Sequence, residues 1–234
     1  MCGMLRVFLL VSWILYTMAS PATSFAGEIQ GRVSIIQGLT KERVVLPTYQ
    51  VRGMSVPAKQ EEKTSIDEFS RVAVYLELAA KAPAPEASKA TLAQRNQRFE
   101  PELLIVPVGT TVSFPNSDPI FHNIFSLSKA KQFDLGYYPA GETRTVKFEK
   151  AGIVQVYCHI HTDMNAAIVV APSAWHAQPG PDGKFVLRDV PGGTQEVVVW
   201  HKAAGFIRKK IQVPESGSVE VSFDVPVLEK EGVR

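Results

Sequence analysis

Cysteine is scarce in this chain: there are two among 234 residues, and Cys2 lies in an apolar N-terminal segment. A framework of several disulfides is therefore excluded, and removal of that segment leaves Cys158 as the single cysteine. Thiols in an oxidising compartment are normally paired. A lone cysteine there is either a buried, inert side chain or a thiolate held by a metal.

An excess of charge of one sign is also lacking. The chain has 25 Lys and Arg residues and 23 Asp and Glu residues, and its formal net charge is +2. The basic residues are not interleaved with aromatic residues, so we expect no concentrated basic face of the kind that binds nucleic acid. Nucleic acid is therefore not an expected partner.

Beyond the N-terminus the sequence has no apolar run of membrane-spanning length. In residues 1–26 the only charge is Arg6, which precedes an apolar core, and small residues surround a cleavage position after Ala26. This pattern is typical of a secretory signal peptide. A retained membrane anchor is the alternative, but the run is short for a span of about 20 residues. We expect a periplasmic protein that starts near Glu28 and has no membrane span after signal removal.

Long amphipathic helical patterns are absent as well. Short segments with alternating or continuous apolar and β-branched residues recur between Pro, Gly and Ser turns, which is typical of all-β sandwiches or barrels. The expected strands lie in 27–36, 71–79, 102–114, 143–150, 152–158, 165–171, 183–190, 194–201, 207–213 and 218–225.

Two changes in composition divide the chain. Residues 79–97 are rich in Ala, Pro, Lys and Gln and indicate an exposed linker with a possible helical turn in its second half, and residues 171–183 are a second joint rich in Pro and Gly. The predicted parts are a signal peptide (1–26), N-terminal sandwich strands (27–80), a linker (81–96), a central domain (97–172) and C-terminal sandwich strands (173–234).

The stretch VYCHIHTDM, residues 156–164, concentrates metal-binding side chains at the end of an apolar strand. Cys158, His161 and Met164 follow one another with the spacing C-x2-H-x2-M. Neighbouring residues on an extended strand point to opposite faces, so His159 is expected to point away from Cys158, which favours His161 as the ligand. His122, in the loop and strand FPNSDPIFHNIFSLS, is the expected distant imidazole.

A thiolate, two imidazoles and a thioether are the donors of copper electron-transfer sites. We therefore expect His122, Cys158, His161 and Met164 to hold one copper ion. One alternative is structural zinc, which does not use thioether and would recruit His159 in place of Met164. The other is a Cys–His nucleophile pair, for which no orienting carboxylate or amide is evident.

Two segments carry a family resemblance. RFEPELLIVPVGTTVSFPNSDPIFHNIFS (98–126) and AGIVQVYCHIHTDMNAAIVV (151–170) resemble the cupredoxins, the small blue-copper proteins, and the ligand spacing resembles amicyanin-like members. The whole chain resembles exported cupredoxin-like proteins labelled methylamine utilisation proteins. The resemblance implies a Greek-key β-sandwich with one type 1 copper ion.

By this resemblance, His122, Cys158 and His161 are the equatorial ligands and Met164 is the axial ligand. Asn123 would help to hold the thiolate through a backbone N–H bond.

The flanking strands resemble a carboxypeptidase regulatory-like β-sandwich, a small fold of the immunoglobulin or transthyretin type. The resemblance is carried by GKFVLRDVPGGTQEVVVWH (183–201), in which a glycine pair supplies the turn between two strands. It implies either one discontinuous domain around the central domain or two N-terminal strands packed on a C-terminal sandwich.

The resemblance implies an electron carrier rather than an enzyme, with no catalytic residue and with redox proteins as partners. Two alternatives stay open: a periplasmic copper-binding carrier that handles copper, and a β-sandwich binding module without redox activity. A multicopper enzyme is disfavoured because the exported part has no second Cys–His cluster.

Overall fold

The computed structural model describes residues 26–36, 50–51, 54–55, 67–77 and 89–225. Within these ranges every regular element is a strand except the short 3-10 helix η1 (Glu68–Arg71), which confirms the predicted all-β, multi-sheet fold. The described residues contain no helix long and apolar enough to span a membrane. Residues 1–25 of the predicted signal peptide, with Cys2, lie outside the described part of the chain.

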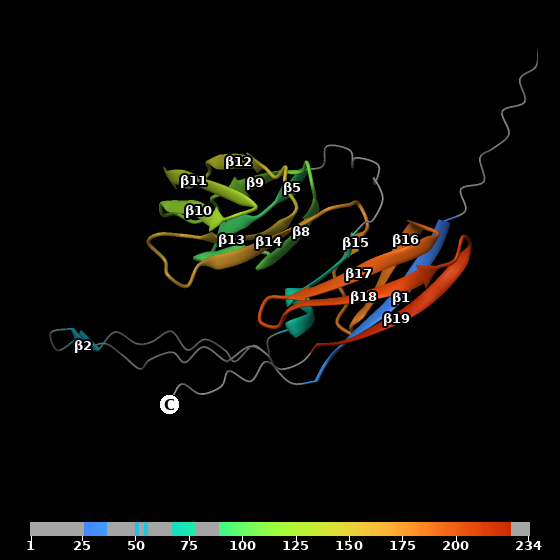
Figure 1. Cartoon of the computed structure of the whole chain (residues 1–234). Helices are drawn as coiled ribbons and strands as arrows, with labels where there is room; N and C mark the ends of the chain where they lie inside the picture. Colours follow the sequence, from blue (N-terminus) through green and yellow to red (C-terminus); the bar gives the residue numbers. More distant parts are fainter. Residues whose placement is uncertain (1–25, 37–49, 52–53, 56–66, 78–88, 226–234) are drawn as a thin grey trace, which may run out of the picture.

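The first sandwich is formed by residues 89–171, whose two sheets lie together in Figure 1. One sheet has the order β11-β10-β13-β14-β8, and the other has the order β12-β9-β5. The strands of the larger sheet are β8 (Leu103–Pro107), β10 (His122–Ser128), β11 (Lys131–Tyr138), β13 (Gly152–Tyr157) and β14 (Asn165–Ala171). Those of the smaller sheet are β5 (Lys89–Thr91), β9 (Thr111–Pro115) and β12 (Thr143–Lys147).

Part of the segment expected as a linker belongs to this sandwich. Besides β5, it contains β6 (Ala93–Arg95), which forms an antiparallel hairpin with β7 (Arg98–Glu100). Leu92 is fully buried in the core of the sandwich. The polar composition of these residues concealed short strands of which only a few side chains face the interior. In residues 89–97, the part of this segment that the structure describes, no helical turn forms.

The second sandwich combines strands from both ends of the chain. Its sheets have the orders β16-β1-β19 and β15-β4-β17-β18, so β1 and β4 pair with strands that follow the first sandwich. The strands are β1 (Ala26–Ile35), β4 (Val72–Glu77), β15 (His176–Ala177), β16 (Lys184–Pro191), β17 (Gly193–His201), β18 (Gly205–Val213) and β19 (Gly217–Val225). A separate pair, β2 (Gln50–Val51) and β3 (Met54–Ser55), completes the described strands.

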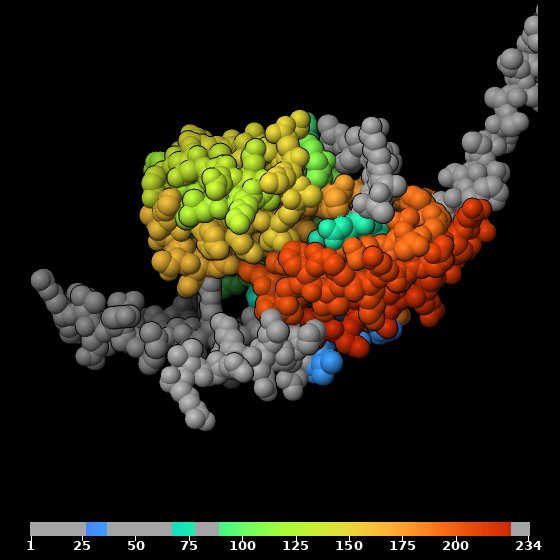
Figure 2. All heavy atoms as spheres, in the orientation of Figure 1, coloured from blue at the N-terminus to red at the C-terminus, as the bar shows by residue number. Residues whose placement is uncertain are grey.

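The two sandwiches pack directly on each other, and Figure 2 shows them as adjoining lobes with the atoms of residues 67–77 between them. On β14, Ala166, Ile168 and Val170 face the core of the first sandwich. The alternate residues Ala167 and Val169 join a separate buried cluster with side chains of β4, β8 and β17. Successive side chains of a strand point to opposite faces, so these strands are buried on both faces and their sequences are continuous apolar runs.

Candidate metal centre

Three of the predicted ligands converge at one end of the first sandwich. Nδ1 of His122 lies 3.9 Å from Sγ of Cys158, and Nδ1 of His161 lies 3.8 Å from the same sulfur. The donor atoms of the three residues all lie within 4.8 Å of one another. His122 is fully buried, Cys158 is 5% exposed, and His161 is half-buried.

The two sulfur–nitrogen separations fit a metal ion that binds the thiolate and each imidazole at a trigonal angle. With metal–sulfur and metal–nitrogen bonds of about 2.3 and 2.0 Å, donor atoms at trigonal angles lie about 3.7 Å apart. The two Sγ–Nδ1 distances, 3.9 and 3.8 Å, are close to this value. Cys158 is also the single free cysteine among the described residues, so it has no disulfide partner there. The residues therefore fit a thiolate and bis-imidazole metal site.

The sheet order explains why residues so distant in sequence meet. β10 begins at His122, and β13 ends at Tyr157, immediately before Cys158. The two strands are antiparallel and pair at Phe125 and Tyr157. The start of one antiparallel strand lies beside the end of its neighbour, so the imidazole and the thiol come to the same edge.

The ligand loop, residues 158–164, is closed by its own backbone hydrogen bonds. The N–H of Met164 donates to the carbonyl of His161 at 2.9 Å, and the N–H of Cys158 donates to the carbonyl of Met164 at 3.2 Å. Met164 is 1% exposed and belongs to the same buried cluster as Cys158. The structure thus places the thioether side chain in the core beside the site, and its axial ligation stays a prediction.

His159 lies outside this group. Its ring stacks on Phe125 with a centroid separation of 3.9 Å and an interplanar angle of 4°. Its Nε2 lies 3.5 Å from Oδ2 of Asp134. The structure therefore brings His161 to Cys158 and gives His159 other contacts. Because β13 ends at Tyr157, this difference arises in the loop and not from the alternation of side chains along a strand.

Asn123 links the two segments that carry the ligands through its side chain. Its Oδ1 accepts the N–H of His159 at 2.8 Å, and its Nδ2 donates to Oδ1 of Asp134 at 2.9 Å. The first bond fastens the residue after Cys158 to the residue after His122, and the second ties Asn123 to β11. The expected backbone N–H bond from Asn123 to the thiolate stays a prediction.

Asp118 contacts the site but was missed by the sequence analysis. Its Oδ2 lies 2.8 Å from Nε2 of His122, on the side of the ring opposite the sulfur. Only 8% of the Asp118 side chain is exposed. An acid four residues before a candidate ligand, in the polar loop NSDP, was the available signal, since metal-binding histidines commonly donate their second ring N–H to a carboxylate.

Burial and hydrogen bonding set the charge of the groups around the sulfur. Burial raises the pKa of the Asp118 carboxyl, but the N–H of Gln97, the His122 ring and the N–H of Asn96 lower it more, so the pKa lies below its ordinary value. Burial and the neighbouring His122 lower the pKa of His161, and Asp118 opposes them. Asp118 is therefore ionised and His161 is neutral at pH 7, which suits an imidazole that binds metal.

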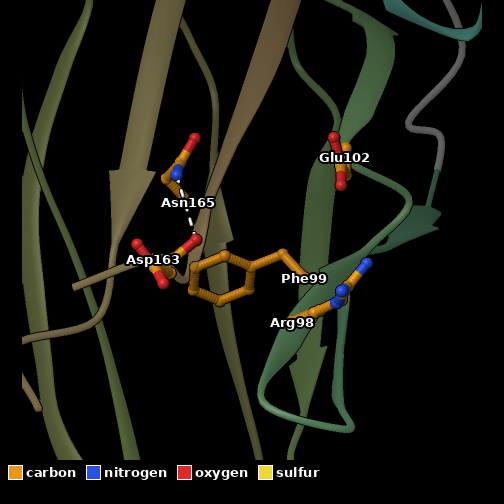
Figure 3. Close-up of a pocket in the computed structure, with 5 residues that line it drawn as sticks. All are labelled: Arg98, Phe99, Glu102, Asp163 and Asn165. Atoms are coloured by element: carbon orange, nitrogen blue, oxygen red, sulfur yellow. Dashed lines mark hydrogen bonds between the residues drawn. The ribbon is translucent and has the colours of Figure 1, made fainter. Parts of the chain in front are cut away.

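A small hollow lies beside the end of the ligand loop. Figure 3 shows Asp163 and Asn165 on one side, Arg98 and Glu102 on the other, and the ring of Phe99 between them. Nδ2 of Asn165 donates to the carbonyl of Asp163 at 3.1 Å. The hollow is lined by one cationic side chain, Arg98, and two carboxylates, Glu102 and Asp163. None of the three candidate ligands His122, Cys158 and His161 lines it.

Comparison with known proteins gives similarity at the level of solved structures. No protein-family model matches the chain, and no curated protein matches it. A solved structure described as a novel purple cupredoxin from Nitrosopumilus maritimus is 26% identical, with a TM-score of 0.33 over 35% of this chain and 99% of its own. A reduced amicyanin mutant is 20% identical, with a TM-score of 0.34 over 42% of this chain and 97% of its own.

A copper-containing nitrite reductase from Thermus scotoductus SA-01 is 28% identical, with a TM-score of 0.34 over 41% of this chain and 25% of its own. Each similarity covers less than half of this chain. The case for a metal site therefore rests on the chain's own contacts, above all on the two imidazole nitrogens beside the Cys158 sulfur.

Proposed function

We propose that this chain is an exported, periplasmic type 1 copper protein that passes single electrons between redox-protein partners and is not itself an enzyme. The observation that most supports the proposal is the convergence of one buried thiol and two imidazole Nδ1 atoms at separations of 3.9 and 3.8 Å. Soft sulfur with imidazole is a donor set that serves copper in both oxidation states. Met164 is proposed as the axial ligand.

A bound copper ion would supply a one-electron couple between Cu(II) and Cu(I). The chain contributes a rigid site, because His122 and Met164 are 0% and 1% exposed and their neighbours are paired strands. Side chains packed in this way keep their positions when the charge of the site changes. Burial also excludes water from the sulfur, which protects a thiolate from oxidation.

Partner access is proposed to occur on the side of His161, the half-buried imidazole of the three-residue group. Its sequence neighbour Ile160 is 50% exposed, and Phe121, which precedes His122, is 57% exposed. Exposed apolar side chains beside a buried site favour a transient contact with another protein.

The second sandwich is proposed to be a single discontinuous unit that serves as a scaffold or docking module. The support for this proposal is that β1 and β4, which precede the first sandwich in the chain, are hydrogen-bonded to β16, β17 and β19, which follow it.

The test is to add Cu(II) to the metal-free protein and to record visible absorption and electron paramagnetic resonance. We expect an intense thiolate-to-copper absorption band and its loss in Cys158→Ser, a substitution that keeps the size of the side chain. Circular dichroism of both proteins serves as the folding control. If the wild type has no such band, or if Cys158→Ser retains it, the proposed site is wrong.

Electron transfer and copper delivery predict different behaviour of the loaded protein. A carrier would give up copper readily to a chelator, whereas an electron carrier should undergo repeated reduction and oxidation without metal loss. The contacts of His159 support electron transfer. A copper-delivery site could use His159 as an extra exchange ligand, but its ring is engaged by Phe125 and Asp134. Fast release of Cu(I) to a chelator would favour the carrier.

A further inference from the structure

The Asp118 carboxylate is surrounded by three hydrogen-bond donors. Its Oδ2 lies 2.8 Å from Nε2 of His122 and accepts the N–H of Gln97 at 2.8 Å, while its Oδ1 accepts the N–H of Asn96 at 2.6 Å. Its own N–H donates to Oδ1 of Asn116 at 3.0 Å. The carboxylate is thus fixed in orientation from both sides.

The two amide donors come from the turn of the β6–β7 hairpin. Asn96 and Gln97 both have positive φ, 54° and 57°, as the two central residues of a type I′ turn require. In this conformation their consecutive N–H groups both reach the same carboxylate. Side chains other than glycine adopt positive φ at an energetic cost, so the turn is held by its surroundings.

The hairpin is itself anchored in the core. The carbonyl of Gln94 accepts the N–H of Ser117 at 2.8 Å, and the Nε2 of Gln94 donates to the hydroxyl of Tyr138. That hydroxyl donates to the carbonyl of Phe114 at 3.1 Å. Burial raises the pKa of Tyr138 to about 12, so the hydroxyl remains a donor at neutral pH. The hairpin that donates to Asp118 is therefore anchored by the fully buried residues Gln94, Tyr138 and Phe114.

The hydrogen bond to Asp118 determines which nitrogen of His122 carries the proton. An ionised carboxylate only accepts hydrogen bonds, so the proton of a neutral His122 ring lies on Nε2. Nδ1 then has a free lone pair directed toward the region of the Cys158 sulfur, 3.9 Å away. The opposite tautomer would place a proton where a metal bond has to form.

The same carboxylate puts a negative charge near the metal position. The Asp118 side chain is 8% exposed, so solvent screens its charge only weakly. A fixed negative charge one imidazole ring away stabilises the more highly charged ion of a redox pair more than the less charged ion.

We propose that Asp118 is a positioning residue for the metal centre: it holds His122 as the Nε2–H tautomer, with Nδ1 directed at the metal, and it favours Cu(II) over Cu(I). The inference rests on the proposed function for the identity of the metal. The part of the inference about the His122 tautomer involves only residues of this chain and does not depend on bound copper or on a redox role.

The first experiment measures the tautomer in the metal-free wild type by long-range nitrogen–proton NMR of the His122 ring. We expect a single Nε2–H form, and an Nδ1–H form would overturn the inference. Asp118→Ala removes the acceptor, so its His122 ring should lose this single form. Because the measurement needs no copper, it remains decisive if the proposed function fails.

The second experiment separates orientation from charge by using Asp118→Asn. The amide oxygen of this variant can still accept from His122, so the tautomer should persist while the negative charge is lost. We expect affinity for Cu(II), measured by chelator competition, to fall by about 10- to 100-fold. Affinity for Cu(I) should fall by a factor at least ten times smaller than the factor for Cu(II). This difference corresponds to a rise of about 59 mV or more in the reduction potential of Asp118→Asn.

The matched control is Glu149→Gln, which removes one negative charge from the same sandwich at a carboxylate whose side chain is 66% exposed. Its ratio of Cu(II) to Cu(I) affinity should equal that of the wild type. An equal ratio in Asp118→Asn would overturn the charge component. If Asp118→Ala does not fold, the wild-type NMR measurement still decides the tautomer, and the ratio of Cu(II) to Cu(I) affinity in Asp118→Asn still decides the effect of charge. Absence of a copper band in the wild type would contradict the proposed function and not the tautomer.

Discussion

Nζ of Lys202, in the turn between β17 and β18, donates a 2.8 Å hydrogen bond to Oδ1 of Asn165, the residue that follows Met164. The second sandwich therefore touches the end of the ligand loop as well as the back of the sheet that carries it. A second polar contact between the sandwiches is the ion pair of Arg71 with Glu102, at 2.8 Å. Together with the buried apolar cluster between the sandwiches, these bonds connect the second sandwich to the candidate site.

Replacement of Lys202 by methionine tests this contact. Lys202→Met keeps most of the apolar stem and removes the donor, so we expect a loss of about 0.5–1.5 kcal/mol in the free energy of unfolding. Amide hydrogen exchange at Asn165 and in the ligand loop should become faster, because one fastening of the loop is lost. Lys209→Met, a change on the outer strand β18, is the matched control and should leave exchange in the ligand loop unchanged. Equal exchange in the wild type and Lys202→Met would contradict a role of Lys202 in holding the loop.

Trp200 tests the apolar contact between the sandwiches. Its side chain belongs to the buried cluster shared by β4, β8, β14 and β17, and it is 5% exposed. Trp200→Ala should reduce the free energy of unfolding by about 3–5 kcal/mol, because it leaves a cavity where the sandwiches meet. Chemical denaturation followed by circular dichroism measures this change, and separation into two transitions would indicate that the sandwiches no longer unfold together.

Phe206→Ala provides the comparison for Trp200→Ala. Phe206 is also a large aromatic residue of the second sandwich, but it is 46% exposed. Its removal should change the free energy of unfolding by less than about 1 kcal/mol. Similar losses for the two variants would show that the contact between the sandwiches contributes little.

The sequence predicted the strands of the two sandwiches better than their assembly. Apolar runs such as that of β14 indicate strands, but they do not say what covers the second face. In the structure Ala167 and Val169 face the other sandwich, so the run is continuous because both faces are buried. The strand β11 was missed because Gln132, Asp134 and Gly136 interrupt its apolar pattern, and its pattern of half-buried and exposed residues is that of an edge strand.

The candidate site was predicted for a different reason. Cys158 and His161 are close in sequence, so the residue types and their spacing suggest the site. The alternation argument for His161 over His159 assumes an extended chain, whereas β13 ends at Tyr157. The contact between Asp118 and the β6–β7 turn could not be predicted in this way. It depends on a hairpin in a segment whose composition resembles a linker, and on backbone N–H groups that no side-chain pattern reveals.

Stability is expected to depend on pH through His201. The side chain is fully buried, its Nδ1 accepts the N–H groups of Ala203 and Ala204 at 3.1 and 3.2 Å, and its Nε2 lies 3.3 Å from Glu68. Burial lowers the pKa of His201 below its ordinary value of 6.5, with a further lowering by Arg71, and Glu68 opposes the change. The proton that charges the ring would bind to Nδ1, where it would face the N–H groups of Ala203 and Ala204.

The folded protein therefore binds a proton at His201 less readily than the unfolded chain does. As pH falls below 6.5, the unfolded chain takes up the proton first, so the free energy of unfolding decreases toward lower pH. His201→Asn keeps an acceptor for the two N–H groups and removes the titration. Urea denaturation between pH 7 and about 5 should show a smaller loss of stability in this variant than in the wild type. Parallel pH profiles would exclude His201 as a source of the effect.

The two histidines of the ligand loop give the most direct test of which imidazole belongs to the site. His161 has its Nδ1 3.8 Å from Sγ of Cys158, whereas the ring of His159 stacks on Phe125. With Cu(II) added, His159→Ala should keep the intense thiolate-to-copper band, and His161→Ala should lose it. Each variant removes one imidazole from the same loop, so each controls for the other.

The stability of the two variants supplies an independent measurement. His159→Ala removes an aromatic stack and should lower the free energy of unfolding of the metal-free protein by about 0.5–1.5 kcal/mol. The half-buried His161 has no aromatic stack of this kind in the described structure, where its ring is tilted by 58° against His122. Loss of the band in His159→Ala with retention in His161→Ala would reverse the assignment of the ligand. Retention in both variants would show that neither imidazole is needed for the thiolate–copper bond.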